Sequence, residues 1–268
     1  MPLFFLMTMF LSTIISTGLP SAGHAGSPQV TAVTLSTPAT DFSKPFTAVI
    51  HFTLSPEWYL YWTNPGDAGL PVAARWDLPR GFSAGPLRFP TPEKIVHEDI
   101  VAYGYFHELV LLCTLTPPAD YRPAKGDSLR VHLDWLVCSE SCVPGKTSIT
   151  LALDHAAPTG QYAAELADRF TRQAPGDLSA AGITVGPARV TSSDNHVTLH
   201  IPLNGAIDDF YPEPIENVVI EHKRITVGAD GITMPVTPYD ASTVMKSISG
   251  IAIIRGKGYR LETPIEYR

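Results

Sequence analysis

Hydrophobic and polar residues alternate along most of the chain in short runs. Apolar side chains occupy roughly every second position of these runs, and many are β-branched or aromatic. A period of two is typical of strands that bury one face. Clusters of Pro, Gly and Asp separate the runs, which lie at 30–37, 46–54, 72–79, 109–118, 129–138 and 147–154. We therefore expect an all-β domain, an antiparallel sandwich, over residues 27–155.

A helical pattern interrupts the strands near residue 160. Helix-forming residues dominate TGQYAAELADRFTRQ, in which Tyr162, Leu166 and Phe170 recur at four-residue steps. Pro175 and the glycine after it would end such a helix. The pattern predicts a helical linker over residues 156–180.

Strand-like runs return in the last third of the chain. VTLHIPLN, NVVIEHKRITVG and IAIIRGKGYRLETPIEY again mix β-branched and aromatic residues with polar ones. Ala229-Asp230-Gly231 has the composition of a hairpin turn. We expect a second, smaller β-sandwich-like domain over residues 181–268.

The first 25 residues have the features of an export signal. An apolar stretch from Leu3 to about Ile15 is followed by the small-residue site Gly23-His24-Ala25, although no Lys or Arg precedes the stretch. The stretch is shorter than the roughly 20 residues that span a bilayer. We expect a signal peptide over residues 1–25, cleavage after Ala25 and a periplasmic mature protein, where disulfides persist.

Composition narrows the classes of function. The net charge is −7, and no run of Lys or Arg interrupts the chain. An acidic chain without a basic patch does not suit nucleic acid, so we expect no nucleic-acid partner. Glycine-rich phosphate loops and serine elbows are also absent from the sequence.

The segment VCSESCVPG contains two of the three cysteines, Cys138 and Cys142. It lies between two predicted strands, so the pair sits at a tip that a partner can reach. Residues four apart in an extended strand are about 13 Å apart, so a disulfide needs a tight turn here. So small a ring stabilises a fold by only roughly 2 kcal/mol. The third cysteine, Cys113, lies inside an apolar strand and is expected to be a buried free thiol.

Three interpretations of the pair stay open from the spacing alone. A redox-active disulfide, a structural disulfide and a soft-metal site all fit Cys-x₃-Cys. Cu(I) would need a third ligand, for which His97, His107 and His132 are candidates. Lys146 could lower the pKa of Cys142, and Asp134 or Asp99 could accept a proton.

Three blocks together resemble a known family. WYLYWTNPGDAGLPVAARWDLPRGF, HEDIVAYGYFHELVLL and DWLVCSESCVPG are similar to the N-terminal periplasmic domain of the thiol:disulfide interchange protein DsbD family, and closest to the branch of the copper-sensitivity suppressor ScsB. The resemblance covers roughly residues 30–155. It implies an immunoglobulin-like sandwich with an exchanging pair, Cys138 and Cys142.

The resemblance also implies partners and a covering loop. In the family the pair takes electrons from a membrane-embedded thiol reductase domain and passes them to periplasmic thioredoxin-fold proteins, without a cofactor or metal. The segment 97–105 resembles the family's cap loop, with Asp99 in its acidic part and Tyr103 as the covering aromatic. Because the chain stops at Arg268, we expect either that the membrane partner is a separate protein or that the protein is a relay of another kind.

Two further groups are interpreted from the residues themselves. The first is a block of aromatic side chains, which we expect mainly to pack in the core, with a ligand or partner surface as the alternative. Its members are Trp58, Tyr59, Tyr61 and Trp62. Asn64-Pro65-Gly66-Asp67 has the composition of a turn. A non-catalytic binding or chaperone module and a Cu(I)-binding copper-tolerance protein remain the alternatives to the electron relay.

Overall fold

The computed structural model describes residues 28–153, 160–193, 196–240 and 242–267. The predicted signal peptide therefore lies outside the described residues. Within them, no helix has the length and apolar character needed to cross a bilayer. The part of the chain that the structure describes consists of strands with one α-helix and two short 3-10 helices, as expected for an all-β fold.

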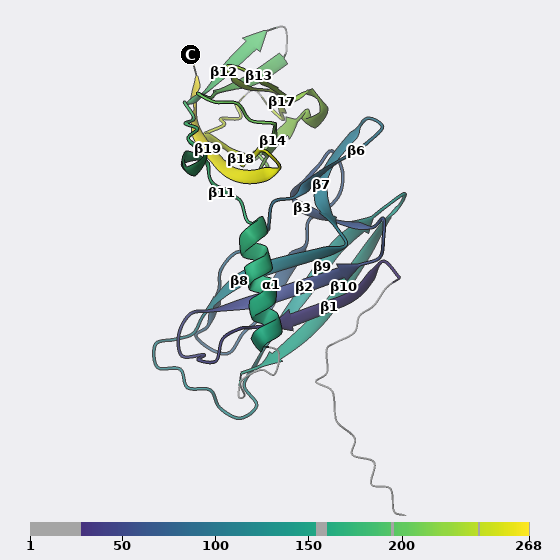
Figure 1. The fold of residues 1–268 in the computed structure, drawn as a ribbon, viewed down its shortest axis with the longest axis vertical. Helices are drawn as coiled ribbons and strands as arrows, with labels where there is room; N and C mark the ends of the chain where they lie inside the picture. Colours follow the sequence, from purple (N-terminus) through teal and green to yellow (C-terminus); the bar gives the residue numbers. More distant parts are fainter. Residues whose placement is uncertain (1–27, 154–159, 194–195, 241, 268) are drawn as a thin grey trace, which may run out of the picture.

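Two antiparallel sheets form the first sandwich (Figure 1). One sheet has the order β1 (Val30–Ser36), β2 (Phe46–Leu54), β8 (Glu108–Thr116), β5 (Ser83–Ala84). The other has the order β10 (Cys142–Ala152), β9 (Ser128–Cys138), β3 (Tyr59–Gly66), β7 (Ile100–Phe106), β6 (Glu93–His97), with β4 (Ala73–Asp77) also paired to β9.

The core of the first sandwich follows from the period-two pattern. In β9 the alternate residues Leu129, Val131, Leu133, Trp135 and Val137 are buried. They meet the apolar face of the opposite sheet, where the rings of Phe52 and Trp135 pack edge to face with centroids 5.3 Å apart. This confirms the expected immunoglobulin-like sandwich.

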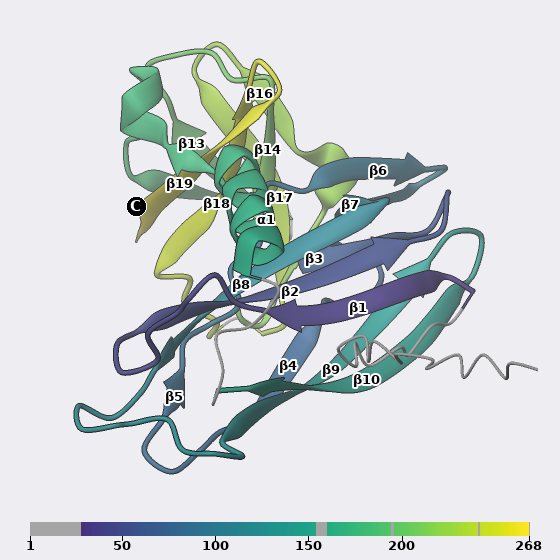
Figure 2. The same cartoon turned by 60° about the horizontal axis from the view of Figure 1, so that its bottom comes forward.

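Helix α1 (Gly160–Gln173) packs against the outer face of the first sandwich (Figure 2). Its buried residues Ala163, Leu166 and Phe170 contact apolar side chains of β2 and β8. Tyr162, the first member of the predicted stripe, is 44% exposed and bonds through its hydroxyl to His51 Nδ1 (2.9 Å). The helix is thus an integral part of the first sandwich's surface, held by an apolar stripe of period 3.6.

The remaining strands form one nine-stranded sheet, Gly176–Tyr267, called the C-terminal sheet below. Its core includes Leu199, Phe210, Ile232 and Leu261. The predicted hairpin at Ala229–Gly231 is present. The elements are β11 (Gly176–Asp177), η1 (Leu178–Ala181), β12 (Ala188–Ser193), β13 (His196–Pro202), β14 (Asp209–Pro212), β15 (Val218–Ile220), η2 (His222–Arg224), β16 (Thr226–Gly228), β17 (Gly231–Pro238), β18 (Ser247–Ile254) and β19 (Lys257–Tyr267).

Candidate functional site

A disulfide joins Cys138 and Cys142 at the tip of the β9–β10 hairpin. Cys138 ends β9, Cys142 begins β10, and the two residues are direct cross-strand partners with Cα atoms 4.2 Å apart. The backbone N–H of Ser139 donates to the carbonyl of Ser141 (3.2 Å), which closes the turn. The tight turn that a disulfide of this spacing requires is therefore a hairpin turn.

The two sulfurs differ in their access to solvent. Cys138 lies in an inner strand, opposite Tyr59 of β3, and is 1% exposed. Cys142 lies on β10, at the edge of the six-stranded sheet, and is exposed. A molecule that approaches from solvent therefore meets Cys142.

Two tyrosines of β3 flank the disulfide. The Tyr61 hydroxyl lies 3.6 Å from Cys142 Sγ, and the Tyr59 hydroxyl lies 3.4 Å from that of Tyr61. Burial, with Tyr59 as a second cause, raises the pKa of Tyr61 far above its usual value. The Tyr61 hydroxyl therefore keeps its proton and can donate a hydrogen bond to a thiolate at Cys142.

A glycine lets a loop close over the Tyr61 ring. Gly69 has φ +116°, and a Cβ at this position would lie 2.3 Å from the ring. Pro71, two residues later, forms a β-bridge with Tyr61. Only glycine allows so close an approach in this backbone conformation, so the loop holds Tyr61 in place beside the sulfur.

The two residues assigned to the cap lie away from the sulfurs. Tyr103 is fully buried on the β7 face opposite to that of Ala102, which clusters with Tyr61 and Cys138. The Tyr103 ring packs against Tyr211 instead, with centroids 4.9 Å apart. In this structure Tyr103 therefore does not cover the disulfide, and the aromatic residues beside the sulfurs are tyrosines of β3.

Asp99 lies at the turn of the β6–β7 hairpin. Its side chain is 92% exposed and forms an ion pair with Lys223 of the C-terminal sheet. That ion pair lowers the pKa of Asp99. Both predicted cap residues thus contact the C-terminal sheet.

Lys146 lies further along β10 than Cys142, and its effect on the pKa of Cys142 stays a prediction. Both residues lie on β10, four positions apart in an extended strand, and Lys146 faces Asp134 across the hairpin. The Cα atoms of two residues four positions apart in a strand are about 13 Å apart. Asp134 is likewise four positions from Cys138 on β9, and its role as a proton acceptor stays a prediction.

The candidate metal ligands do not gather around the cysteines. His132 Nε2 lies 2.6 Å from Asp77 Oδ2, and His97 and His107 lie in or beside the turns at either end of β7. Among the residues described, no group of three or more His, Cys, Asp or Glu side chains could hold a metal. Cys113 is a buried free thiol, as predicted, and burial raises its pKa to about 11.

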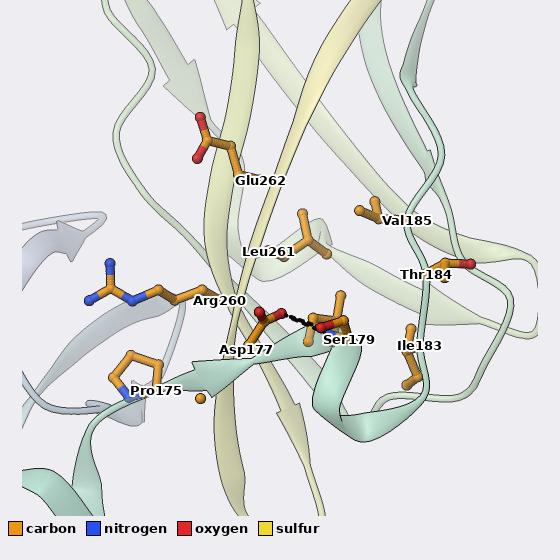
Figure 3. A pocket seen from close by; sticks show the side chains of 11 residues that line it. Pro175, Asp177, Ser179, Ile183, Thr184, Val185, Arg260, Leu261 and Glu262 are labelled. Carbon is orange, nitrogen blue, oxygen red and sulfur yellow. Dashed lines mark hydrogen bonds between the residues drawn. The ribbon is translucent and has the colours of Figure 1, made fainter.

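A separate groove of about 530 Å³ lies on the C-terminal sheet (Figure 3). The Asp177 carboxylate, one of its lining groups, accepts hydrogen bonds from both the backbone N–H and the hydroxyl of Ser179, each 2.9 Å long. Asp177 thus serves as the N-cap of η1. This role accounts for the carboxylate without a ligand.

The sequence pattern does not single out Tyr59 and Tyr61 as part of the site. Alternation predicts that they share one face of a strand, which is correct, but not that this face meets the cysteines. The available signal is that both tyrosines lie in WYLYWTNPGDAGLPVAARWDLPRGF, one of the three blocks that resemble the family.

The comparisons with known proteins agree with this geometry. Residues 28–154 match the family model described as "Thiol:disulfide interchange protein DsbD, N-terminal". No curated protein matches the chain.

Two of the solved structures that match the chain are domains of related name. The N-terminal periplasmic domain of ScsB from Proteus mirabilis has a TM-score of 0.65 at 17% identity, over 87% of this chain and 91% of that one. The reduced N-terminal domain of DsbD from Neisseria meningitidis has a TM-score of 0.32 at 17% identity, over 49% of this chain and 93% of that one. The ScsB match shows that this fold, including the C-terminal sheet, occurs in a periplasmic domain. Residues 28–154 therefore form a domain of the DsbD N-terminal family, as the sequence blocks predict.

Proposed function

We propose that this protein relays electrons in the periplasm by thiol–disulfide exchange at Cys138 and Cys142. The observation that carries the proposal is the asymmetry of the pair. Cys142 is exposed on an edge strand, whereas Cys138 is 1% exposed. Exchange requires in-line approach of a thiolate to one sulfur, and access decides which sulfur is attacked. Cys142 is therefore the sulfur that partners meet, and Cys138 is the resolving one.

Each half of the relay is a balanced two-electron exchange. A thiolate of the electron donor attacks Cys142 Sγ, the bond to Cys138 breaks, and Cys138 leaves as a thiolate that takes up a proton. The donor's second thiolate then breaks the mixed disulfide and releases Cys142. The donor is oxidised to a disulfide, and the pair has gained two electrons and one proton, with Cys138 as a thiol and Cys142 as a thiolate.

Delivery runs the same steps in reverse. The Cys142 thiolate attacks the disulfide of an acceptor, and Cys138 resolves the mixed disulfide. The family match supports this class of chemistry. We infer that the donor is a membrane-embedded thiol reductase domain and that the acceptors are thioredoxin-fold proteins. Sulfur carries the electrons, so the relay itself needs no cofactor.

Serine variants of the two cysteines test the proposal. In Cys138→Ser the resolving thiol is lost, so a mixed disulfide between Cys142 and a thioredoxin-fold partner should accumulate. Cys142→Ser should trap little, because the remaining sulfur is buried. The adduct is detected as a reducible band on a non-reducing gel and identified by mass spectrometry.

The double variant Cys138→Ser/Cys142→Ser is the matched control, because it keeps Cys113. It should form no adduct. Failure of both single variants to trap a thioredoxin-fold protein would reject the relay, and trapping by Cys142→Ser alone would reverse the two roles.

The reduction potential separates the relay from a structural disulfide. Structural disulfides of exported proteins have potentials below about −300 mV, whereas exchanging pairs lie in the higher range of glutaredoxins and disulfide isomerases. We expect the Cys138–Cys142 pair in the higher range.

A further inference from the structure

Strands β3 and β7 are covered on both of their faces. In β7, the five consecutive residues from Val101 to Tyr105 are all buried. Successive side chains of a strand point to opposite faces, so burial of a whole run requires packing on both sides. The two faces of this strand pair contact different parts of the molecule.

The first face adjoins the redox site. It contains Tyr59 and Tyr61 of β3 and Ala102 of β7, and Tyr61 and Ala102 cluster with Cys138. The rings of Tyr59 and Phe106 pack across the two strands with centroids 5.4 Å apart. A displacement of β3 relative to the β9–β10 hairpin would therefore change the contact between Tyr61 and Cys142.

The second face adjoins the C-terminal sheet. Tyr103 of β7 lies between Trp62 of β3 and two residues of the C-terminal sheet, Tyr211 and His222. The Tyr103 hydroxyl lies 3.4 Å from His222 Nδ1. Burial lowers the pKa of His222 despite the opposing charge of Asp67, so its ring is neutral at neutral pH and packs without a buried charge.

Polar contacts fix the same two strands and the hairpin beside them. The buried side chain of Asn64 in β3 donates from Nδ2 to the carbonyl of Pro212 (2.7 Å). Lys94 of β6 forms an ion pair with Asp209 (2.9 Å), and Lys223 forms one with Asp99 at the hairpin turn. The contacts thus come from three strands of the first sandwich, which gives the interface a single orientation.

We infer that the C-terminal sheet is a positioning support for the redox site. It holds β3 and β7 from behind, so that the Tyr61 hydroxyl stays against Cys142 and stabilises the thiolate of the reduced pair. Tyr211, His222 and Lys223 are positioning residues that act through Tyr61. The inference rests on the proposed function only in that the pair must be reducible. It gives the C-terminal sheet a role that the exchange chemistry alone does not require.

The test measures the equilibrium between the disulfide and the dithiol in glutathione buffers, without any protein partner. Tyr211→Ala removes the ring behind Tyr103, and the matched control Tyr239→Ala removes a tyrosine of the same sheet that is 71% exposed. We expect Tyr211→Ala to shift the equilibrium toward the disulfide by about threefold or more, a size typical of coupling through a packed network. Tyr239→Ala should match the wild type.

A second variant tests the interface without opening a cavity. Lys223→Glu places a carboxylate beside Asp99, whereas Arg224→Glu makes the same charge change on η2 at a residue that pairs with Glu221 instead. Lys223→Glu should shift the equilibrium in the same direction as Tyr211→Ala, and Arg224→Glu should not. Because Lys223 is a surface residue, this pair decides the question if Tyr211→Ala does not fold.

A double-mutant cycle tests the route through Tyr61. In the Tyr61→Phe background the interface variants should have no further effect, because the hydroxyl that they displace is already absent. An undiminished effect in that background, a shift toward the dithiol, or wild-type values in both interface variants would overturn the inference. None of these results depends on trapping a partner. The equilibrium measurements can therefore reject the role of the C-terminal sheet without rejecting the relay, and the trapping experiment can reject the relay without rejecting that role.

Discussion

At the scale of single residues, the Tyr61 hydroxyl is the group whose chemistry matters most to the exposed sulfur. It lies 3.6 Å from Cys142 Sγ and remains protonated, because burial raises its pKa. A hydrogen bond stabilises a charged acceptor by about 1.5–3 kcal/mol. The same hydroxyl therefore favours the thiolate over the thiol when the pair is reduced.

Tyr61→Phe should raise the pKa of the Cys142 thiol. One pKa unit corresponds to about 1.4 kcal/mol, so loss of the hydrogen bond predicts a rise of about one to two units. The pH dependence of iodoacetamide alkylation of the reduced protein measures it. Tyr59→Phe is the control. The Tyr59 hydroxyl contacts the Tyr61 hydroxyl and acts on the sulfur only through it, so Tyr59→Phe should raise the pKa of Cys142 less than Tyr61→Phe. Equal pKa values in Tyr61→Phe and the wild type would show that the hydroxyl does not act on the thiolate.

The cysteines of the site could be predicted from the sequence, but their neighbours could not. Cys138 and Cys142 are recognisable from the sequence as a candidate exchange site. Their short spacing at a strand tip permits only a small disulfide ring, and such a ring contributes little stability to the fold. Tyr61 and Tyr103 each lie in an alternating strand pattern, so the sequence does not distinguish them. Only tertiary packing decides which of the two contacts the sulfur. Tyr103 was assigned to the cap by resemblance, whereas its ring contacts Tyr211, more than 100 positions away.

At the scale of elements, period-two runs predict most strands well, because each buries one face. Asn64-Pro65-Gly66-Asp67 is more complex than the predicted turn. Asn64 Oδ1 accepts from the Gly66 N–H, as in a turn, but the segment up to Gly66 belongs to β3. The amide of Asn64 also contacts the C-terminal sheet, which local composition cannot reveal.

The helix offers a prediction at this scale. The apolar stripe correctly predicts a helix, but its packing on the first sandwich depends on β2 and β8. Leu166 is 1% exposed, so Leu166→Ala should destabilise the protein by about 2–5 kcal/mol through lost burial and a cavity. Urea unfolding measures the change, and Asp168→Ala, at an exposed position of the helix, is the control. A loss below about 0.5 kcal/mol, typical of surface substitutions, would mean that the helix is not packed as described.

At the scale of the whole molecule, the apolar core of the first sandwich continues into the C-terminal sheet. Tyr211, Ile251 and Ile253 of that sheet belong to the same cluster of buried residues as Tyr103 and Trp62. The sequence predicts two β units, since strand patterns lie on both sides of the helix. It cannot predict that they share a core, because each contributing residue also fits a core of its own unit.

A shared core implies coupled unfolding, and the chain contains a natural probe for it. All four tryptophans, Trp58, Trp62, Trp76 and Trp135, lie in the first sandwich, so their fluorescence reports mainly that part. Far-UV circular dichroism reports both parts. Because loss of one unit would expose the apolar surface of the other, we expect the two signals to follow a single urea transition with coincident midpoints.

Tyr211→Ala should separate the two transitions, because it removes the largest side chain that the C-terminal sheet contributes to the shared core. The tryptophan and circular dichroism midpoints should then differ, while Tyr239→Ala keeps them coincident. Separate transitions in the wild type would contradict the coupling. They would also weaken the case for a support behind the redox site, since a sheet that unfolds independently contributes too little interface energy to hold β3 and β7 in place.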